Sequence, residues 1–494
     1  MNPAQILASG RTLYPNAVAI HHGKHHLTYE RLFRDVERIA GHLLAAGIGP
    51  GTLVGIDIQP PLSQWVVLLA VMRLGARSVT LTDRFEAEVA ALPGLAAVIT
   101  DREPPRPLPR AVRSLAVAAA WLRHAPPPGP PLPTPEAAAG TVGRVSFTSG
   151  TSGRPKAVEL GPETLRARLS GTARRGRINT RSVLWCGLGA DVAYGFTAPL
   201  AAWLEGAAVV FSLGGRGAYA YLSARQTNLV IASPAAVAAL LRDATAGLAP
   251  PLAASVIVAG GRLSVGLRDA LLGRLCTEVL VAYGSSEAGG VTLGDARGLD
   301  GHPGHVGAVF PDVEAIVVDE EGRPLPPGTA GRLGVRSDAA AAGYLGDPQA
   351  TARHFLDGWF FPGDIASLSA DRALTILGRP DDSLNVGGVK LSGEDLDALA
   401  QAQADVEDAC ALVLPDDRLA VALVGHPASV EALAAAIRAG LPSLPRFQLI
   451  AIPRVPRGSM GKVNRDALAE IVAAAMASPP RGPLAGQIAV LGAF

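Results

Sequence analysis

A short segment near residue 150 combines hydroxyl groups, glycines and a lysine. The sequence SFTSGTSGRPKAVEL, residues 146–160, follows an apolar stretch, and its polar part ends at Lys156. Glycines let backbone N–H groups converge on an anion, hydroxyls donate further hydrogen bonds, and a lysine adds positive charge. The spacing differs from the usual P-loop, because Arg154 and Pro155 separate Gly153 from Lys156. The segment is therefore either a phosphate loop of another type or a polar surface turn.

Three further segments carry side chains suited to a nucleotide and its metal ion. In AYGSSEAGG, residues 282–290, Tyr283 can stack on a base and Glu287 can hold Mg²⁺. Asp364 follows a glycine turn, where a carboxylate can accept hydrogen bonds from ribose hydroxyls. Lys462 lies in a glycine-rich loop shortly before the last predicted helix. Together with the first segment, these side chains predict a nucleotide site.

Alternating helix and strand patterns must position these side chains. Residues 27–100 alternate between amphipathic helix and short apolar strand, and a second such stretch runs from about 183 to 300. This alternation predicts two α/β units with largely buried sheets. From about 304 to 380, short strands and Gly/Pro turns predict a small antiparallel β unit, and a compact α+β piece follows and ends near residue 475. The fold class is therefore α/β with several domains.

One segment is expected to be irregular, and another is expected to be peripheral. Residues 125–140, APPPGPPLPTPEAAAG, form a proline-rich connector that we expect to be irregular. The tail PPRGPLAGQIAVLGAF, residues 479–494, is expected to be peripheral.

Composition and charge argue against several classes of protein. The 494 residues carry a formal net charge of +1, so nothing in the charge favours nucleic acid or an anionic membrane as a partner. The three cysteines, Cys186, Cys276 and Cys410, form no CxxC pair, which argues against a disulfide scaffold and a structural zinc site. The N-terminus lacks the pattern of a signal peptide, and the most apolar run, WVVLLAVM, is too short to span a bilayer. We therefore expect a cytoplasmic protein.

The motifs, in this order, resemble those of the adenylate-forming superfamily: acyl- and aryl-CoA synthetases, luciferases and the adenylation domains of peptide synthetases. The resemblance extends from LTYERL, residues 27–32, to GKVNRDAL, residues 461–468. It implies a large N-terminal domain, residues 1–380, made of two α/β subdomains and a small β-barrel-like unit. A small, mobile α+β C-terminal domain, residues 381–494, is expected to follow.

The resemblance also implies roles for individual residues. The TSGTSGRPK segment matches the family's phosphate-binding loop, Tyr283 the aromatic residue that stacks on adenine, and Glu287 the Mg²⁺ ligand. Lys462 matches the lysine that bridges the substrate carboxylate and the α-phosphate; with Lys156 and Glu287 it forms the expected catalytic set. The positions expected around ATP are Thr148, Ser149, Gly150, Thr151, Ser152, Gly153, Lys156, Gly260, Gly261, Tyr283, Gly284, Ser286, Asp364 and Arg379.

The implied reaction joins an acid to a thiol in two steps. A small-molecule carboxylate attacks the α-phosphorus of ATP and displaces pyrophosphate, while Lys462 and Mg²⁺ neutralise the repulsion between the two anions. The small domain then turns about Asp381, the expected hinge, and a thiol captures the acyl-adenylate. No phosphopantetheine attachment sequence follows Lys462. The acceptor is therefore expected to be CoA or the phosphopantetheine of a discrete acyl carrier protein.

The acid is expected to bind near GLGADVAYGFTAPLAAW, residues 187–203. This segment lacks the histidine that many acyl-CoA synthetases carry there. Asp191 lies near the position where amino-acid-activating relatives place an aspartate against the substrate ammonium; a helix N-cap is the alternative role. Tyr194 and Ser285 are further candidates for contact with the acid. The sequence also departs from the family pattern, with Ser286 in place of the usual threonine.

Other interpretations remain open at this point. GSSEA, residues 284–288, approximates the nucleophile elbow of a serine hydrolase, but a hydrolase would leave the other motifs unexplained. A non-catalytic nucleotide-binding protein would not need Glu287, Asp364 and Lys462 together. An adenylating enzyme that uses a non-thiol acceptor or an unusual acid is the third alternative. The histidines of HHGKHH, residues 21–26, are expected to form a β-hairpin rather than a metal site.

Overall fold

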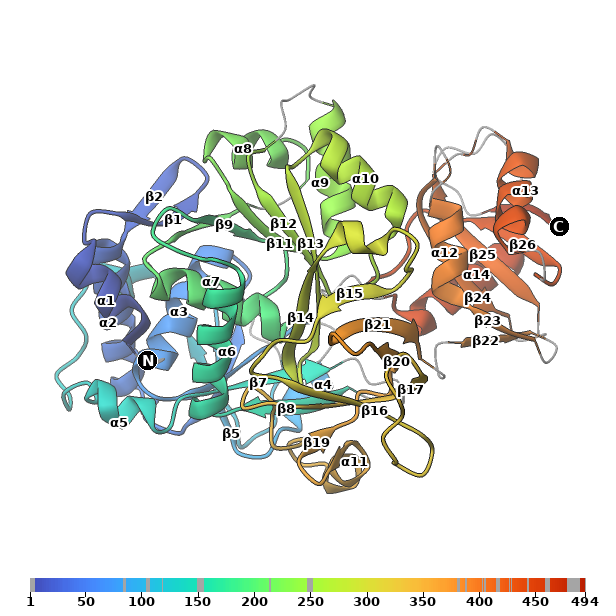
Figure 1. Cartoon of the computed structure of the whole chain (residues 1–494). Helices are drawn as coiled ribbons and strands as arrows, with labels where there is room; N and C mark the ends of the chain where they lie inside the picture. The colour runs from blue at the N-terminus through green and yellow to red at the C-terminus, as the bar shows by residue number, and fades with distance from the viewer. Residues whose placement is uncertain are drawn as a thin grey trace.

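Three sheets and their helices make up the larger part of the molecule, and the elements from β22 (Ser383–Val386) onward lie to one side of it (Figure 1). This computed structural model describes residues 5–82, 86–103, 107–117, 119–148, 155–212, 215–246, 252–379, 383–386, 389–401, 403, 406–414, 418–425, 427, 429–441, 444–457, 463–477 and 489–493. The mixed α/β architecture agrees with the predicted fold class.

The first sheet carries the two strands that flank the predicted phosphate loop. Its strands are β3 (Leu53–Asp57), β4 (Arg77–Thr80), β5 (Leu95–Thr100), β6 (Arg113–Ala116), β7 (Gly143–Thr148) and β8 (Lys156–Leu160). Their order is β6-β5-β3-β4-β7-β8, parallel throughout except for the hairpin β7–β8. In that hairpin Thr148 lies opposite Lys156, so both ends of the predicted phosphate loop meet at one edge of the sheet.

The second sheet ends in the turn that carries Glu287. Its strands are β1 (Val18–His22), β2 (His25–Thr28), β9 (Val183–Cys186), β10 (Ala208–Phe211), β11 (Leu229–Ala232), β12 (Ser255–Ala259), β13 (Glu278–Ser285) and β14 (Gly289–Asp295). The order is β14-β13-β12-β11-β9-β10-β1-β2, with the two outermost strands antiparallel to their neighbours and the rest parallel. In such α/β sheets, ligands bind outside the carboxyl ends of the parallel strands.

Helices cover these two sheets, and one apolar core joins them. The helices are α1 (Ile6–Leu13), α2 (Tyr29–Ala45), α3 (Pro61–Arg73), α4 (Glu86–Ala90), α5 (Pro135–Ala139), α6 (Pro162–Arg175), α7 (Ala193–Leu204), α8 (Ala218–Ala224), α9 (Pro234–Ala246) and α10 (Val265–Arg274), with 3₁₀ turns at Ala119–Leu122 and Ala296–Leu299. Helices α6 and α7 pack against each other (Figure 1). The largest core cluster includes Ile56 of β3, Val209 of β10 and Trp203 of α7, so it spans both sheets.

The third sheet is the small antiparallel unit that the sequence predicts after residue 304. It contains β15 (His305–Ala308), β16 (Glu314–Val318), β17 (Ala330–Arg336), β18 (Phe355–Leu356), β19 (Trp359–Phe360), β20 (Ile365–Leu368) and β21 (Ala373–Gly378). The sheet path is β15-β21-β20-β17-β19-β18, and β16 pairs with β17. One short helix, α11 (Pro348–His354), precedes β18. This unit contributes Asp364, Tyr344 and His354 to the candidate site.

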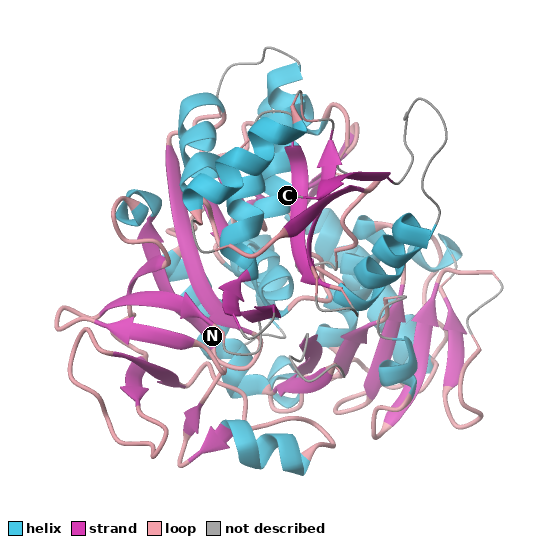
Figure 2. Ribbon diagram, turned by 90° about the vertical axis from the view of Figure 1, so that its right-hand side faces the viewer, coloured by secondary structure: helices cyan, strands magenta, loops and turns pink. Residues whose placement is uncertain are grey.

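The C-terminal elements have sheets and core clusters of their own. They comprise β22, β23 (Val389–Ser392), β24 (Val406–Val413), β25 (Leu419–Gly425), β26 (Phe447–Ala451), β27 (Ala489–Ala493), α12 (Gly393–Gln401), α13 (Val430–Gly440) and α14 (Arg465–Ala477). Strands β24-β25-β26-β27 form one sheet and β22–β23 a hairpin. Their core clusters contain only residues from Leu384 onward. Figure 2 views the molecule from the side where these elements lie.

The expectation that residues 125–140 are irregular throughout is wrong. Residues 125–140 include the short helix α5, because Thr134 caps its first turn by accepting a hydrogen bond from the Ala137 amide at 3.3 Å. Pro135 occupies the first helical position, where a missing N–H costs nothing. In the tail that was expected to be peripheral, β27 pairs with β26 and forms the edge strand of the last sheet. In the described ranges no helix has both the length and the hydropathy to cross a bilayer.

Candidate active site

The strands that flank the phosphate loop end in groups suited to an anion. The Thr148 side chain is buried at the end of β7, and its hydroxyl has no hydrogen-bond partner among the described residues. Lys156 begins β8, half-buried. The loop residues predicted to contact phosphate between them, Ser149, Gly150, Thr151, Ser152 and Gly153, lie outside the described residues. An unpaired buried hydroxyl is costly unless a ligand or water completes it.

Lys156 contacts two side chains of the third sheet's unit. Its Nζ lies 3.4 Å from Nε2 of His354 and 5.1 Å from the centroid of the Tyr344 ring. The His354 and Tyr344 rings meet edge to face, with their centroids 5.9 Å apart. The ammonium is thus held by a ring nitrogen and by the electron-rich face of an aromatic ring.

Glu287 is buried and its carboxylate is already oriented. Tyr344 donates its hydroxyl hydrogen to Oε1 of Glu287 at 3.0 Å. Burial, followed by the charge of Glu287 and this hydrogen bond, raises the pKa of Tyr344, so the phenol stays protonated as a donor. The backbone carbonyl of Glu287 accepts a hydrogen bond from the Ala341 amide at 2.7 Å. The remaining lone pairs of the carboxylate stay available for a ligand.

A buried arginine on α6 holds the backbone of this turn. Arg168 donates from Nη2 to the carbonyls of Ser286 and Glu287, at 2.8 and 3.0 Å, and from Nε to the carbonyl of Ala339 at 2.8 Å. Burial lowers the pKa of Arg168 to about 10, although the charge of Glu287 acts in the opposite direction. The guanidinium therefore remains a cation at neutral pH, and it ties α6 to the turn that carries Glu287.

Tyr283, Asp364 and Arg379, which sequence motifs predict around the nucleotide, meet in the structure. The Tyr283 hydroxyl donates to one carboxylate oxygen of Asp364, and Nε of Arg379 donates to the other. Asp364 is buried, with 5% of its surface exposed. Burial, and next the charge of Asp364, raises the pKa of Tyr283 well above its ordinary value, which keeps the phenol a donor. A carboxylate has about four acceptor positions, so Asp364 can still accept from a ligand's hydroxyls.

Two glycine positions near β12 and β13 admit no side chain. A Cβ on Gly284 would lie 2.3 Å from the carbonyl oxygen of Gly289 on the paired strand. Gly260, directly after β12, has a φ of +83°, a conformation that other residues rarely adopt. Gly261 follows it, facing Pro234. Glycine is therefore required at position 284 by the close approach of β14 and at position 260 by the backbone conformation. The place of these glycines beneath an adenine stays a prediction.

The hydroxyl-bearing turn after β13 makes a local contact instead of a catalytic one. The Ser285 hydroxyl oxygen accepts a hydrogen bond from the Ala288 amide at 3.0 Å. A serine nucleophile would instead donate to a base such as histidine. The described contact of Ser285 is therefore structural. In GSSEA the spacing of the nucleophile elbow places the nucleophile at Ser286, so the contact of Ser285 does not test the hydrolase alternative.

The segment expected to bind the acid lies beside a second buried arginine. Arg144, on β7, is fully buried. It donates to Ser78 at 3.3 Å, to Thr80 at 2.7 Å and to the Ala190 carbonyl at 2.5 Å. Burial lowers the pKa of Arg144 to about 9, while the nearby charge of Asp191 acts in the opposite direction. Asp191 therefore belongs to the electrostatic surroundings of a buried cation.

Helix α7 begins one residue later than an N-cap role for Asp191 would require. Its N-cap is Val192, whose side chain makes no capping hydrogen bond. The N-cap alternative for Asp191 is therefore wrong. Tyr194 lies in the first turn of α7, half-buried, and burial raises the pKa of its phenol. Its hydroxyl thus stays protonated, as a donor or acceptor toward a ligand.

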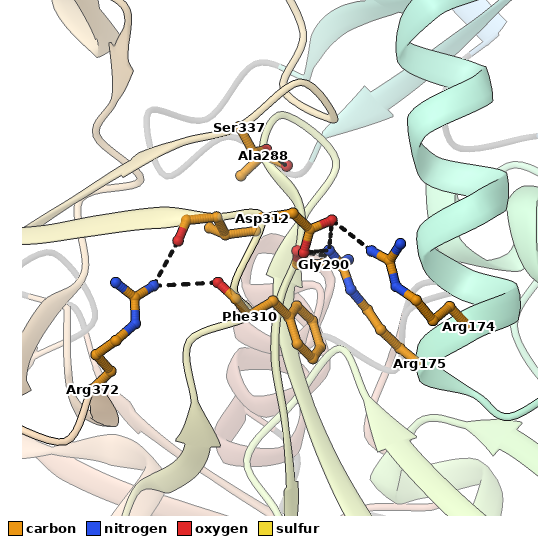
Figure 3. Close-up of polar contacts among 9 residues, drawn as sticks. Arg174, Arg175, Ala288, Gly290, Phe310, Asp312, Ser337 and Arg372 are labelled. Carbon is orange, nitrogen blue, oxygen red and sulfur yellow. Dashed lines mark hydrogen bonds and ion pairs between the residues drawn. The ribbon is translucent and has the colours of Figure 1, made fainter.

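A polar cluster fixes the far end of α6 (Figure 3). Arg174 and Arg175 both donate to Asp312, at 2.7 to 2.8 Å. The Arg175 guanidinium also lies over the Phe310 ring, 3.8 Å from its centroid. Arg372 donates to the Phe310 carbonyl at 3.2 Å. Because α6 also carries the arginine that holds the Glu287 turn, this cluster anchors the C-terminal end of the same helix, and Arg175 there donates to the Gly290 carbonyl at 3.3 Å.

The residues present fit one Mg²⁺ bound mainly through phosphate. Magnesium typically takes one or two protein carboxylates together with phosphate oxygens and water. Glu287 supplies such a carboxylate, and among the described residues no group of three or more potential ligands forms a cage. Two predicted residues, Lys462 and the hinge residue Asp381, lie outside the described residues.

Sequence reasoning missed four residues of the site: Arg144, Arg168, Tyr344 and His354. Each acts through contacts with residues distant in sequence; Lys156 and His354, for example, are 198 positions apart. Local composition carries no signal for such contacts. Only the arginine in the apolar strand GRVSFT is unusual enough to have raised a question.

Comparison with known proteins identifies the family. The AMP-binding enzyme family matches residues 10–345. A probable non-canonical nonribosomal peptide synthetase, CymA of Salinispora arenicola, is 28% identical over 479 residues; the match covers 92% of this chain but only 6% of CymA. The 4-chlorobenzoate–CoA ligase of an Arthrobacter species is 27% identical over 513 residues, with 94% of both chains covered.

The fold is shared with a solved structure. O-succinylbenzoate CoA synthetase (MenE) from Bacillus subtilis, in complex with ATP and magnesium ion, superposes with a TM-score of 0.78 at 19% identity. The superposition covers 94% of this chain and 99% of that chain. Together with the family match over more than half of the sequence, this confirms the predicted resemblance: the chain belongs to the AMP-binding enzyme family.

Proposed function

We propose that the chain uses ATP and Mg²⁺ to activate a carboxylic acid as its acyl-adenylate, with release of pyrophosphate. The acyl group then passes to the thiol of CoA or of a separate carrier protein. One observation carries this proposal: Tyr283, Asp364 and Arg379 meet at the end of β13, next to the turn of Glu287. Along one edge of the sheet, that arrangement offers Tyr283 for a base, Asp364 for a ribose and Glu287 for a metal-bound phosphate.

The described residues divide the work on ATP. Tyr283 offers its ring to the adenine, and Asp364, held by Arg379, accepts hydrogen bonds from the ribose hydroxyls. Lys156 and the loop before it contact the β- and γ-phosphates. Glu287 holds Mg²⁺, which neutralises charge on the phosphates when it is bound. Because the side chains are oriented by Tyr344 and by the arginine on α6, they need little rearrangement to stabilise developing charge.

The chemical step depends on Lys462. In this proposal the acid carboxylate attacks the α-phosphorus, the bond to the pyrophosphate oxygen breaks, and Lys462 balances charge on the attacking carboxylate and the α-phosphate. The C-terminal domain, residues 381–494, then turns about Asp381 and opens a path for the thiol. The three cysteines are free. They suit a reducing, cytoplasmic setting, where we place the activity.

The acid is expected to bind beside Asp191, Tyr194 and Ser285. Two substrate classes fit Asp191 differently: an amino acid would place its ammonium against this carboxylate, whereas an amine-free acid would not need it. The position of Arg144 favours the amine-free class, because the charge of Asp191 already offsets a buried guanidinium. An incoming ammonium would have to compete with Arg144 for that charge.

ATP–pyrophosphate exchange across a panel of acids tests the proposal. The panel pairs α-amino acids with their amine-free counterparts, such as phenylalanine with 3-phenylpropionate, and adds 4-chlorobenzoate. We expect exchange with one or more amine-free acids. Exchange with no acid would refute acid activation. Exchange with amino acids alone, lost in Asp191→Asn, would instead assign Asp191 to the substrate ammonium.

The role of Lys462 has a separate test. The Lys462→Ala variant should lose acid-dependent exchange by about 10²-fold or more while still binding ATP. Lys24→Ala is the control, because Lys24 is exposed in the β1–β2 hairpin, at the opposite edge of the second sheet from β13 and β14. Normal adenylate formation by Lys462→Ala would show that the assigned role is wrong. Hydrolysis of an ester without ATP would point to a hydrolase instead.

A further inference from the structure

His354 is tied on both sides to the segment that follows it. It ends α11, and its backbone carbonyl accepts a hydrogen bond from the Phe361 amide at 2.8 Å. Its Nδ1 lies 3.0 Å from the Phe361 carbonyl oxygen. The ring is therefore fixed by the backbone of a single neighbouring residue, which leaves it little freedom to turn.

These contacts define which nitrogen carries the hydrogen. A carbonyl oxygen can only accept, so Nδ1 of His354 must be the donor to Phe361. The ammonium of Lys156 can only donate, so Nε2, 3.4 Å away, must be the acceptor. Both requirements are met by one form of the ring: the neutral imidazole with its hydrogen on Nδ1.

The same unit also orients the proposed metal ligand. Tyr344 packs edge to face on His354 and donates its hydroxyl to Glu287 at 3.0 Å. Its backbone is held in turn by α11, because the Thr351 hydroxyl accepts from the Tyr344 amide at 2.9 Å. The segment 344–361 therefore touches both the phosphate-loop lysine and the carboxylate that would hold Mg²⁺.

We propose that His354 is a positioning residue for ATP binding: its Nε2 accepts from Lys156 and keeps the ammonium directed along the Tyr344 ring toward the phosphate site. This inference rests on the proposed function, because it assumes that Lys156 meets the phosphates of ATP. A lysine side chain loses considerable rotamer freedom when it is ordered. His354 orders the Lys156 side chain before the nucleotide binds, so that ATP binding does not carry the entropy cost of ordering this side chain.

Direct binding of ATP in the presence of Mg²⁺, measured by calorimetry, tests this without any acid substrate. His354→Phe keeps a flat ring against Tyr344 but removes the acceptor, and should weaken ATP binding by about 5- to 30-fold. His354→Gln offers an acceptor at a similar reach and should recover a large part of that loss. Arg353→Gln, an exposed neighbour on the same helix, should bind ATP within twofold of the wild type.

A double-variant comparison separates positioning from a general structural role. In a Lys156→Met background, His354→Phe should add no further loss of ATP affinity, because the ammonium that it positions is gone. The KM for the acid should stay within about twofold in all His354 variants. Three results would each overturn the inference. ATP affinity could be unchanged in His354→Phe, or His354→Phe could reduce it equally in the wild-type and Lys156→Met backgrounds. The KM for the acid could also rise together with the Kd for ATP.

The two proposals fail in different ways. If ATP binds and responds to His354→Phe as expected, yet no acid supports exchange, the positioning role stands and acid activation falls. If acids support exchange but ATP affinity is the same in the wild type and in His354→Phe, acid activation stands and the positioning role is refuted. If the wild type does not bind ATP, both are refuted.

Discussion

Replacing Arg168 with methionine tests how far the Glu287 turn depends on one buried cation. Methionine keeps an unbranched, apolar side chain but removes the donors to the carbonyls of Ala339, Ser286 and Glu287. Each buried acceptor left unpaired costs about 1–3 kcal/mol. Since water can reach some of them after relaxation, we expect a total loss of about 3–5 kcal/mol, the range found when one partner of a buried charged group is removed.

The same helix supplies a matched control. Arg166 lies two residues before Arg168 on α6, with 43% of its side chain exposed, and pairs with Glu163, which is 81% exposed. An exposed pair of this kind contributes about 0–1 kcal/mol. Arg166→Met therefore removes the same charge from the same helix, without unpairing buried carbonyls.

Two measurements follow from this comparison. Arg168→Met should lower the thermal unfolding midpoint by about 5 °C or more relative to Arg166→Met. It should also raise the Mg²⁺ concentration needed for half-maximal exchange by about 10- to 100-fold, the usual effect of removing a group that orients a metal ligand. A midpoint and a Mg²⁺ requirement equal to those of Arg166→Met would refute the role assigned to Arg168.

Two further substitutions probe the nucleotide edge of the second sheet. Asp364→Asn leaves Arg379 without its anionic partner and should weaken ATP binding by about tenfold or more, as measured by calorimetry; binding within twofold of the wild type would contradict the ribose role. Gly284→Ala forces a Cβ to within 2.3 Å of the Gly289 carbonyl and should destabilise the protein by about 1–3 kcal/mol, whereas Gly266→Ala, which meets nothing within 4 Å on α10, should not. Equal unfolding midpoints for the two alanine variants would show that the close approach at Gly284 is not sterically limiting.

Local sequence patterns were sufficient for the sheets and for the nucleotide edge. Apolar strands such as β3 follow directly from residue type, and the sequence motifs alone predict that Tyr283, Asp364 and Arg379 lie around one nucleotide, where the structure brings them together. The proline content of residues 125–140 predicts no helix, yet α5 forms there because Thr134 is a favourable N-cap and Pro135 is compatible with the first helical position.

The supporting contacts could not be predicted in the same way. Arg168 reaches a carbonyl 119 positions away, and a strand arginine such as Arg144 finds acceptors on β4 and in the loop before α7. The residues next to Arg168 and Arg144 in the sequence do not indicate these hydrogen-bond acceptors, because the acceptors depend on how α6 and the two sheets pack. The pairing of β27 was missed for the same reason: an isolated apolar pentapeptide does not specify which strand edge it will join.

The shared core of the first two sheets decides where this chain can be divided. The cluster that includes Ile56 and Val209 spans both sheets, and Arg144 on β7 donates to the carbonyl of Ala190, just before α7. A fragment that ended between the two sheets would expose apolar surface on both halves, and Arg144 would keep Ser78 and Thr80 but lose the Ala190 carbonyl. The core clusters of the C-terminal elements use only residues from Leu384 onward. A protease or a gene fusion is therefore expected to separate the C-terminal elements intact, whereas the two α/β sheets must be inherited and folded as one unit.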